Sequence, residues 1–440
     1  MNTNEHLNNQ IDNTVRLGFM AVNSGDANRG INLFEDALRI DPDHAGAYLG
    51  LLRAINPDRA KPYAQQLKRC PPEDIKKWIE AHPETCDDAY FPIVERMIVN
   101  TQSVEIIKIL IDCGANFNTK YALHHAILQK NRCELVKLLL EYGADPNIEY
   151  QLRFNETVRL NTVPRDILTC TPLYDAIWNA KDVNVVEILI KHGANVNYIS
   201  RSNENYYKYS WSILDMAVRS NNEAIVRLLL ENNVDIVTGS TGLNRHESEV
   251  CYAKLITYCA LSDAICHSKN INIVKLLLEY GANPNYQYEE HELNGIIVYV
   301  DTYCGLSDVI RYTNDTKMLQ LLLDYGADPT AMFISRWEDE DASDRHKVKT
   351  YSMVEMANKR YKPAMADILT DCIYKKQRIN KLEEKISSLR DEQQKLQSTL
   401  PDIKGLFAET KRKNCYKRLA KIEDELKDLE IQLKQLQNMP

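Results

Sequence analysis

Apolar residues recur along most of the chain with the three-and-four spacing of amphipathic helices. The clearest copies place leucine, isoleucine and valine on one helical face and end at Gly-Ala-Asn or Gly-Ala-Asp. They occupy residues 104–118, 134–147, 184–197, 272–285 and 317–330, and a weaker copy at 224–236 has Asn233 in place of the glycine. Glycine, and after it asparagine, adopts the left-handed conformation that ends helices. The pattern therefore predicts repeated helical units, each closed by a left-handed residue.

A second, shorter helix signal precedes the later copies, at residues 121–127, 171–177, 212–218, 260–265 and 305–310. Thr171, Pro172, Leu173 and Ala176 give its fullest form, Thr-Pro-Leu-x-x-Ala. Together the two segments resemble the ankyrin repeat. The resemblance extends over residues 85–373, with a closing unit at 352–373. It implies an all-α solenoid of about seven stacked antiparallel helix pairs.

The repeats are longer than the resemblance implies. The helix-ending residues fall at 114, 143, 193, 233, 281 and 326, so most intervals exceed the typical repeat of about 33 residues. The additional residues lie between each closing turn and the next short helix. We therefore expect enlarged finger loops, projecting from one side of the stack, at 148–169, 198–211, 236–258, 286–303 and 330–350.

Residues 1–84 follow another pattern. Leu17, Gly18, Ala21, Gly30, Phe34, Ala37 and Pro42 are spaced as in the tetratricopeptide repeat, which this segment resembles. The resemblance implies a helical N-terminal domain. Within residues 57–82 we expect two short helices, each with a proline near its start. Because one good repeat is too few for a free-standing array, we expect the segment to cap the first ankyrin unit.

Residues 374–440 predict a coiled coil. Two leucine-rich seams of heptad spacing, at 379–400 and 415–436, are out of phase with each other. The break falls at Pro401 and Gly405, and proline inside a helix costs about 3 kcal/mol. An antiparallel hairpin with its turn near 401–406 satisfies both seams. Two such hairpins could also pair, so a homo-oligomer is a possible arrangement.

Charge divides the chain. The net charge of −8 is the sum of +5 on residues 372–440 and −13 on residues 1–371. An acidic body repels phosphate backbones and attracts cationic partners. We therefore expect a protein partner with basic character and no nucleic acid on the main surface.

Cysteine usage and hydropathy indicate the cellular compartment in which the protein is expected. The eleven cysteines are dispersed, with no C-x-x-C pair, which is typical of reduced thiols. The polar first ten residues do not form a signal peptide. No apolar run approaches the roughly 18 residues of a membrane span. These features predict a cytoplasmic protein without a membrane partner.

Aromatic residues in two fingers are the first candidate binding site. Finger two contains Tyr206, Tyr207, Tyr209 and Trp211, and finger four contains Tyr286, Tyr288 and Tyr299. Tyrosine supplies a large contact area at low entropic cost and keeps a polar end, which suits a binding surface. The alternative is that these rings pack the fingers against one another.

The short helices supply a second candidate site. Asp175, Asp263 and Asp308 recur at one repeat position, and Asp215 lies one position earlier in its own repeat. Stacked helices would align them in a row that could bind a basic peptide, together with His125, which we expect to face the same groove. The alternative is a solvated face with acids near helix starts.

No catalytic, nucleotide-binding or metal-binding motif occurs, and no ligand set surrounds His124 and His125. We therefore expect no enzyme and no cofactor. The favoured hypothesis is a scaffold that binds a protein partner through the ankyrin groove and fingers, with the coiled coil for a second partner or self-association. A bacterial or viral effector that neutralises its target through the same groove is the second hypothesis. An enzyme with its site hidden in the fingers is the third.

Overall fold

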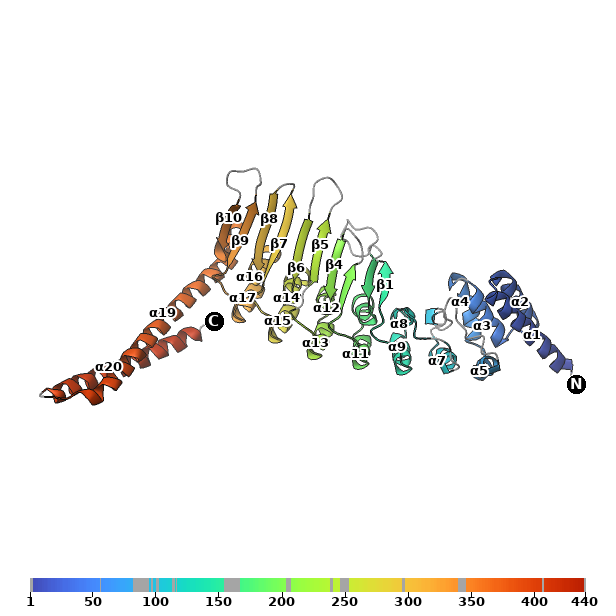
Figure 1. Cartoon of the computed structure of the whole chain (residues 1–440), viewed down its shortest axis with the longest axis horizontal. Coiled ribbons are helices and arrows are strands. Elements are labelled where there is room, and N and C mark those ends of the chain that lie inside the picture. The colour runs from blue at the N-terminus through green and yellow to red at the C-terminus, as the bar shows by residue number, and fades with distance from the viewer. Residues whose placement is uncertain are drawn as a thin grey trace. The chain divides into compact units, whose positions relative to one another are not determined.

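Helices make up most of the described chain, and strands occur only in the finger segments (Figure 1). The computed structural model describes residues 3–55, 57–81, 95, 98–99, 103–112, 115, 117–153, 167–202, 207–237, 240–245, 253–294, 297–338, 346–405 and 407–438. The chain forms two compact units. One comprises residues 1–283 and 289–298, and the other comprises residues 284–288 and 299–440.

The N-terminal segment is helical, as expected. Its helices are α1 (Thr3–Asn23), α2 (Ala27–Ile40), α3 (Ala45–Ala54), α4 (Pro57–Leu67) and α5 (Pro72–Ala81). Phe34 is its fully buried centre, and a Cβ added to Gly18 or Gly50 would come within 2.5 or 2.3 Å of the Phe34 ring. Glycine at these two positions therefore allows α1 and α3 to approach the ring closely. The predicted pair of short helices at 57–82 is confirmed.

Each repeat combines a short opening helix with a longer closing helix. The opening helices are α8 (Ala122–Ile127), α10 (Pro172–Asp175), α12 (Ile213–Arg219), α14 (Ala260–Asp263), α16 (Gly305–Tyr312) and α18 (Met353–Lys359). The closing helices are α7 (Val104–Asp112), α9 (Arg132–Glu141), α11 (Val183–Lys191), α13 (Glu223–Glu231), α15 (Ile271–Glu279) and α17 (Thr316–Asp324). Single π-helical turns at Ala176–Ala180 and Ala264–Ser268 extend α10 and α14. The alternation buries the leucine-rich faces between neighbouring helices.

The helix-ending residues adopt the predicted left-handed conformation. Gly143, Gly193, Gly281 and Gly326 have φ between +88° and +92°, and Asn233 has φ +59°. Gly114 lies outside the described residues. For most residues with a side chain, adopting this left-handed conformation costs about 1 kcal/mol or more. The turn therefore favours glycine, or asparagine, at these positions.

Asparagine in the closing turns joins one repeat to the next. The Asn147 Nδ2 donates to the carbonyl of Gly193 at 2.9 Å, while its Oδ1 accepts from the Asn195 N–H at 2.7 Å. In the second unit, Asn285 makes the same pair of bonds to the Gly326 carbonyl and the Asp328 N–H. One side chain thereby satisfies a donor and an acceptor of the following turn.

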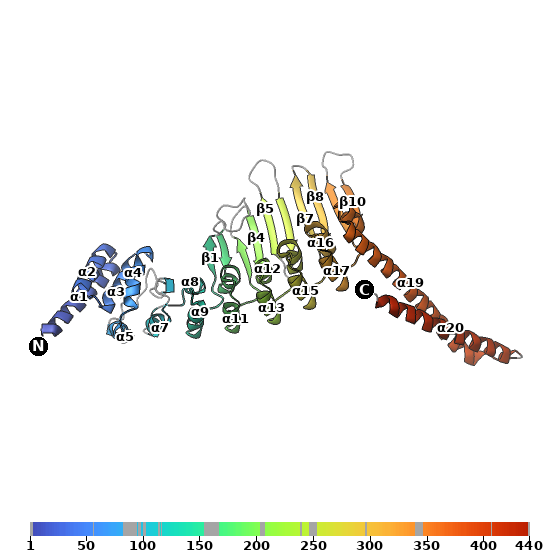
Figure 2. The same cartoon turned by 180° about the vertical axis from the view of Figure 1, so that it is seen from behind.

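The fingers are antiparallel hairpins where we expected loops (Figures 1 and 2). Their strands are β1 (Tyr150–Arg153), β2 (Ile167–Cys170), β3 (Ile199–Ser202), β4 (Tyr207–Ser212), β5 (Ser240–Arg245), β6 (Ala253–Tyr258), β7 (Gln287–Asn294), β8 (Ile297–Cys304), β9 (Met332–Glu338) and β10 (His346–Ser352). In the first unit, β1 to β6 and residues 289–294 of β7 pair in chain order. In the second unit, β8, β9 and β10 do so, and β9 and β10 share seven residue pairs.

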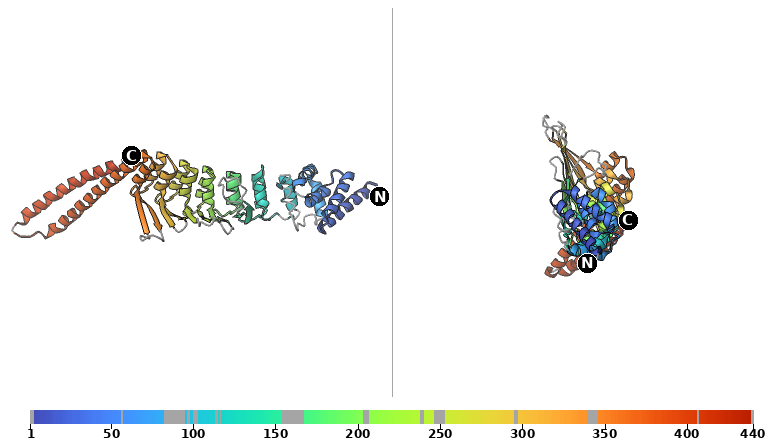
Figure 3. Two further views of the ribbon diagram at one scale, coloured as in Figure 1. Left: turned by 90° about the horizontal axis from the view of Figure 1, so that it is seen from above. Right: turned by 90° about the vertical axis from the view of Figure 1, so that its right-hand side faces the viewer.

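The C-terminal segment is a pair of long helices, visible from above in Figure 3. Helix α19 (Pro363–Thr399) closes the last repeat and runs on without a break past the expected boundary at residue 374. A turn containing Gly405, with φ +108°, leads into α20 (Ala408–Gln437). The apolar cluster between them contains Ile386, Leu389, Ile422, Leu426 and Leu429. Arg418 pairs with Glu392 at 2.7 Å across the same interface.

Candidate functional site

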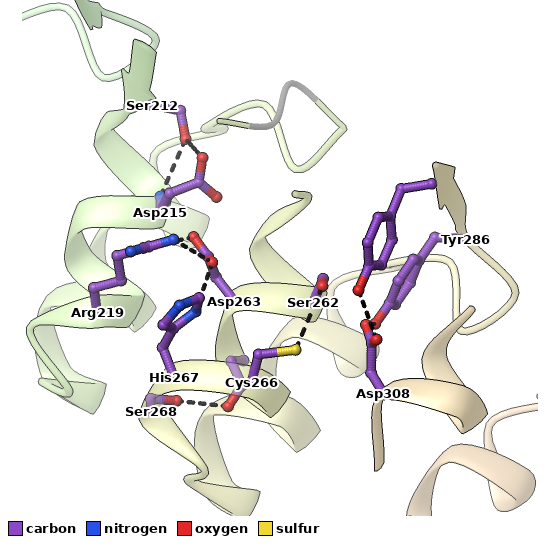
Figure 4. A network of polar contacts seen from close by, with 12 residues as sticks. Ser212, Asp215, Arg219, Ser262, Asp263, Cys266, His267, Ser268, Tyr286 and Asp308 are labelled. Carbon is purple, nitrogen blue, oxygen red and sulfur yellow. Dashed lines mark hydrogen bonds and ion pairs between the residues drawn. The ribbon is translucent and has the colours of Figure 1, made fainter. Parts of the chain in front are cut away.

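Polar side chains gather where the opening helices meet the bases of the fingers (Figure 4). Asp175, Asp263 and Asp308, together with Asp215, are completely buried. Our expectation that they form an exposed row for a basic peptide is therefore wrong with respect to exposure. A buried carboxylate must be paired inside the protein, and each has partners there.

Asp175 joins three elements of the first unit. It lies 2.5 Å from His124 Nδ1 of the preceding opening helix and accepts from Asn179 Nδ2 at 2.7 Å. The Tyr150 hydroxyl, at the start of β1, also donates to it. Burial, and then the charge of Asp175, raise the pKa of Tyr150 well above its usual value, so the hydroxyl remains a donor. The carboxylate thus fastens the first finger strand to two opening helices.

Asp263 pairs with an arginine and lies beside a histidine. It accepts from Arg219 Nε at 2.9 Å and Nη2 at 2.7 Å, and His267 Nδ1 lies 3.0 Å away. The Arg219 guanidinium carbon is 4.2 Å from the ring centroid of Trp211, within range of a cation–π interaction. Trp211, one of the expected partner contacts, is half-buried and holds this arginine in place.

Asp308 pairs with phenols of the second unit. Tyr286 and Tyr288 donate to its two carboxylate oxygens at 2.6 and 2.7 Å. Tyr288 continues a row of rings through Tyr303 at 5.4 Å, Phe333 at 5.1 Å and Tyr351 at 6.1 Å, each distance joining neighbouring centroids. These separations are typical of favourable aromatic pairs. For Tyr286 and Tyr288, the structure thus provides the packing role that was the alternative to partner binding.

Three of the remaining candidates belong to strands farther out along the fingers, and one lies beside His124. Tyr207 and Tyr209 belong to β4 and Tyr299 to β8, and their side chains are not among those described. Tyr206 lies outside the described residues. His125 is half-buried on α8, and burial, followed by repulsion from His124, lowers its pKa from 6.5 to about 4.

One sequence signal for these bases was missed. An aromatic residue directly precedes the N-cap of three opening helices, and a cation follows eight residues later: Trp211 with Arg219, Tyr303 with Arg311, and Tyr351 with Lys359. The cations lie 4.2, 3.9 and 3.5 Å from the ring centroids. This spacing could have been found by aligning the repeats. It indicates that Trp211, Tyr303 and Tyr351 pack inside the protein.

Among the described residues, no group of three or more His, Cys, Asp or Glu side chains is placed to hold a metal ion. None of the described helices is long and apolar enough to cross a membrane.

Comparison with known proteins gives the repeats their family. Family models described as ankyrin repeats match residues 73–150, 160–240 and 258–288. The chain contains ankyrin repeats. The first match begins at residue 73, within α5, and therefore inside residues 1–84, which we assigned to the N-terminal domain. The models leave the tetratricopeptide-like and coiled-coil interpretations as predictions.

Several viral proteins described as ankyrin repeat proteins are similar to this chain. One from Acanthamoeba polyphaga mimivirus is 27% identical over 42% of the chain and 28% of its own length. Another from the same virus is 32% identical over 26% of the chain and 59% of its own length. A fowlpox virus protein is 31% identical over 26% of the chain and 15% of its own length. The chain therefore spans less than two thirds of each of these relatives.

A solved structure, the ankyrin repeat domain of human ASB11, covers 63% of this chain and 96% of its own at 20% identity, with a TM-score of 0.36.

Proposed function

We propose that this protein is a binding scaffold that holds a protein partner against its ankyrin repeats and finger hairpins. The observation that carries the proposal is the anchoring of the finger strands by buried carboxylates: Tyr150 to Asp175, and Tyr286 and Tyr288 to Asp308. A finger that is fixed at its base presents its outer part with little loss of entropy on binding, and preorganisation of this kind increases affinity.

Positions 207, 209 and 299 are the binding residues that we favour. Alternate residues of a strand share one face of a sheet. Positions 207 and 209 therefore share the face of Trp211, and position 299 shares the face of Tyr303. Trp211 and Tyr303 pack against cations of the opening helices, so the rows of aromatic residues extend outward from a structural base. We propose that tyrosines beyond the base contact the partner, and that Tyr206 and His125 contribute to binding.

Charge supports a partner with basic character only at long range. The carboxylates of Asp175, Asp263 and Asp308 are used internally, so they do not contact a ligand. The −13 of residues 1–371 still sets an attractive field for a cationic protein. We assign a second partner or self-association to the pair α19 and α20.

Paired variants test the proposal. The intact chain is used to capture a partner from native lysate, and its affinity is then measured with purified components. Tyr207→Ala with Tyr209→Ala should weaken binding by about 2 kcal/mol or more, roughly 30-fold, without a change in Tm.

Tyr288→Ala is the matched control, since it removes a ring that holds Asp308. It should lower Tm and weaken binding less than the double variant does. Unchanged affinity in the double variant, with a stoichiometric partner in hand, would reject the finger surface.

A second candidate is a viral effector that neutralises a host protein through the same surface. The observation that favours it is that the relatives described above come from mimivirus and fowlpox virus. Inhibition of the captured partner's own activity by the purified chain would distinguish an effector from an adaptor, because an adaptor binds its partner without blocking it.

A further inference from the structure

Basic residues collect around the turn between α19 and α20 (Figure 3). Residues 393–422 contain eight lysines and arginines and two acids, Asp402 and Glu409, which gives a net charge of +6. Because residues 372–440 carry +5 in total, the rest of that segment carries −1. The acidic run 423–425 begins directly beyond the basic region. The positive charge of the C-terminal segment is therefore confined to the turn end of the hairpin.

Most of these cations are available to a partner. The two arginines are engaged inside the hairpin: Arg412 Nη2 donates to the Ile403 carbonyl at 3.0 Å, and Arg418 pairs with Glu392 at 2.7 Å. Lys421 lies 3.8 Å from a glutamate of its own helix. The other five are exposed, and none of them forms an ion pair within the part of the chain that the structure describes: Lys395, Lys404, Lys411, Lys413 and Lys417.

An exposed apolar side chain lies at the same turn. Phe407 is 68% exposed. Gly405, with φ +108°, shapes the turn, and its carbonyl accepts from the Ala408 N–H at 3.0 Å. The bond from Arg412 to the Ile403 carbonyl connects the turn to α20. The turn is thus fixed in the free protein, so presenting Phe407 to a partner costs little additional entropy.

We propose that this turn binds the surface of an anionic lipid bilayer, with Phe407 inserted at the headgroup boundary. Lys404 precedes Phe407, and Lys411 and Lys413 follow it within about 9 Å along the helix axis. That distance is comparable with the Debye length of about 8 Å at physiological salt. Clusters of basic residues attract anionic headgroups, and an inserted apolar side chain adds burial. The proposal rests on the second partner that we assigned to α19 and α20, and it names that partner.

Acids of the last repeat do not oppose the contact. Helix α19 continues beyond that repeat over residues 374–399, a length of about 40 Å. Salt screens charges that are separated by more than the Debye length of about 8 Å. The sequence predicts no membrane partner because it has no spanning segment, but a protein that binds a membrane surface needs none.

Nucleic acid and an acidic protein are other partners that the charge could attract. Recognition of individual phosphates favours the planar fork of arginine over lysine, and both arginines here are engaged within the hairpin. Stacking of successive bases needs neighbouring rings along a groove. Phe407 and Tyr416, the exposed rings of this region, are about 13 Å apart along α20. Free lysines around an exposed phenylalanine favour a lipid surface instead.

The test is flotation of the full chain with vesicles of phosphatidylcholine containing about 30% phosphatidylserine. Binding is expected to these vesicles and not to vesicles of phosphatidylcholine alone. It should weaken by at least about tenfold between 50 and 500 mM salt. The finger variant Tyr207→Ala with Tyr209→Ala should bind the vesicles unchanged, so this proposal and the proposed function can fail separately.

Two matched pairs of variants locate the contact. Phe407→Ser should weaken vesicle binding by about tenfold, whereas Ile431→Ser, at an apolar position of α20 that is 49% exposed, should leave it unchanged. Lys413→Glu should also weaken it by at least about tenfold. Lys427→Glu makes the same charge change at an exposed lysine about 20 Å farther along α20 and should have no effect.

Absent binding to the anionic vesicles, or equal effects of the two variants in either pair, would overturn the proposal. Two further probes are a fluorescein-labelled single-stranded oligonucleotide and fluorescein-labelled polyglutamate. If either binds in place of the vesicles and loses binding in Lys413→Glu, the proposal is overturned in favour of a nucleic acid or an acidic protein.

Discussion

At the residue scale, Asp263 balances two basic side chains where water is scarce. The Arg219 side chain is 15% exposed and Asp263 is fully buried, so the pair depends on its own two hydrogen bonds. Removing one partner of a buried pair leaves an uncompensated charge, which is much more costly than the net stabilisation by the intact pair. Asp175 and Asp308 are also completely buried, and without them the hydroxyl and amide groups that donate to them would lose their acceptor.

Asp263→Ala should therefore lower the free energy of unfolding by about 3–5 kcal/mol. Glu279→Ala, at an exposed surface pair with Lys275, should change it by less than about 1 kcal/mol. Urea denaturation of both variants at pH 7 provides the comparison. A similar small effect in both would mean that Arg219 finds water when its carboxylate is removed.

His125 should make the protein sensitive to acid. Its pKa is about 4 in the folded state and 6.5 in the ordinary state, so the unfolded chain binds the proton more tightly. The stability associated with neutral His125 is complete above pH 6.5 and is lost as the pH falls towards 4. Discounted for partial exposure, the loss is about 2 kcal/mol.

His125→Gln should accordingly show a smaller decrease in stability between pH 7 and pH 4.5 than the unmodified protein. His6→Gln, at an exposed position of α1, is the control and should leave the pH profile unchanged. If the two profiles for positions 125 and 6 coincide, His125 is already solvated in the folded protein.

Element-scale stability comes from the leucine faces of the closing helices. Leu138 and Leu139 of α9 are 6% and 0% exposed. Leu→Ala at either should cost about 2–5 kcal/mol, because the removed methyl groups leave a cavity between repeats. Thermal unfolding followed by circular dichroism gives the measurement. Values below 1 kcal/mol at both positions would contradict the packing.

The hairpin of α19 and α20 can be tested by cross-linking. Leu389 and Leu426 belong to one apolar cluster, so cysteines at these positions should form a bridge within a single chain. Reduced and oxidised samples compared on a denaturing gel would show the faster mobility of a closed loop. A ladder of covalent dimers at low protein concentration would instead indicate a parallel pair of chains.

Helices could be predicted from the sequence more completely than strands. Leucine spacing and the Gly-Ala-Asn ends marked the helices, and Asn233 was correctly expected as a left-handed substitute. The finger strands were missed, although β4 (YKYSWS) and β10 (HKVKTYS) alternate aromatic or β-branched residues with polar ones. β10 pairs with β9 of its own finger, whereas β4 pairs both with β3 of its own finger and with β5 of the next, and the register between fingers cannot be read from local pattern.

The candidate site was predicted only in its residue types. Asp175 and its partner His124 are 51 residues apart, and nothing local to Asp175 indicates that its carboxylate is buried. Tyrosines near the strand bases looked the same in sequence as those farther out. The distinction needed the positions of the opening helices, because it is the hydrogen bonds to Asp308 that identify Tyr286 and Tyr288 as packing residues.

At the scale of the whole molecule, unequal charge should govern association. The net charge is −13 on residues 1–371 and +5 on the remainder. For a basic partner, the association rate should fall by about tenfold or more between 50 and 500 mM salt, while the dissociation rate changes little. Stopped-flow mixing with the captured partner measures both rates. An association rate independent of salt would show that electrostatic attraction does not contribute to recognition of the partner.

The asparagine bridges between closing turns also bear on how such a chain lengthens. Asn147 gives the next turn one donor and one acceptor, and Asn285 gives the same two to its own successor. A repeat that is duplicated in tandem therefore carries both the asparagine side chain and the backbone groups that the preceding asparagine binds. Its two neighbours need no compensating substitution there, so natural selection can act on the new hairpin alone.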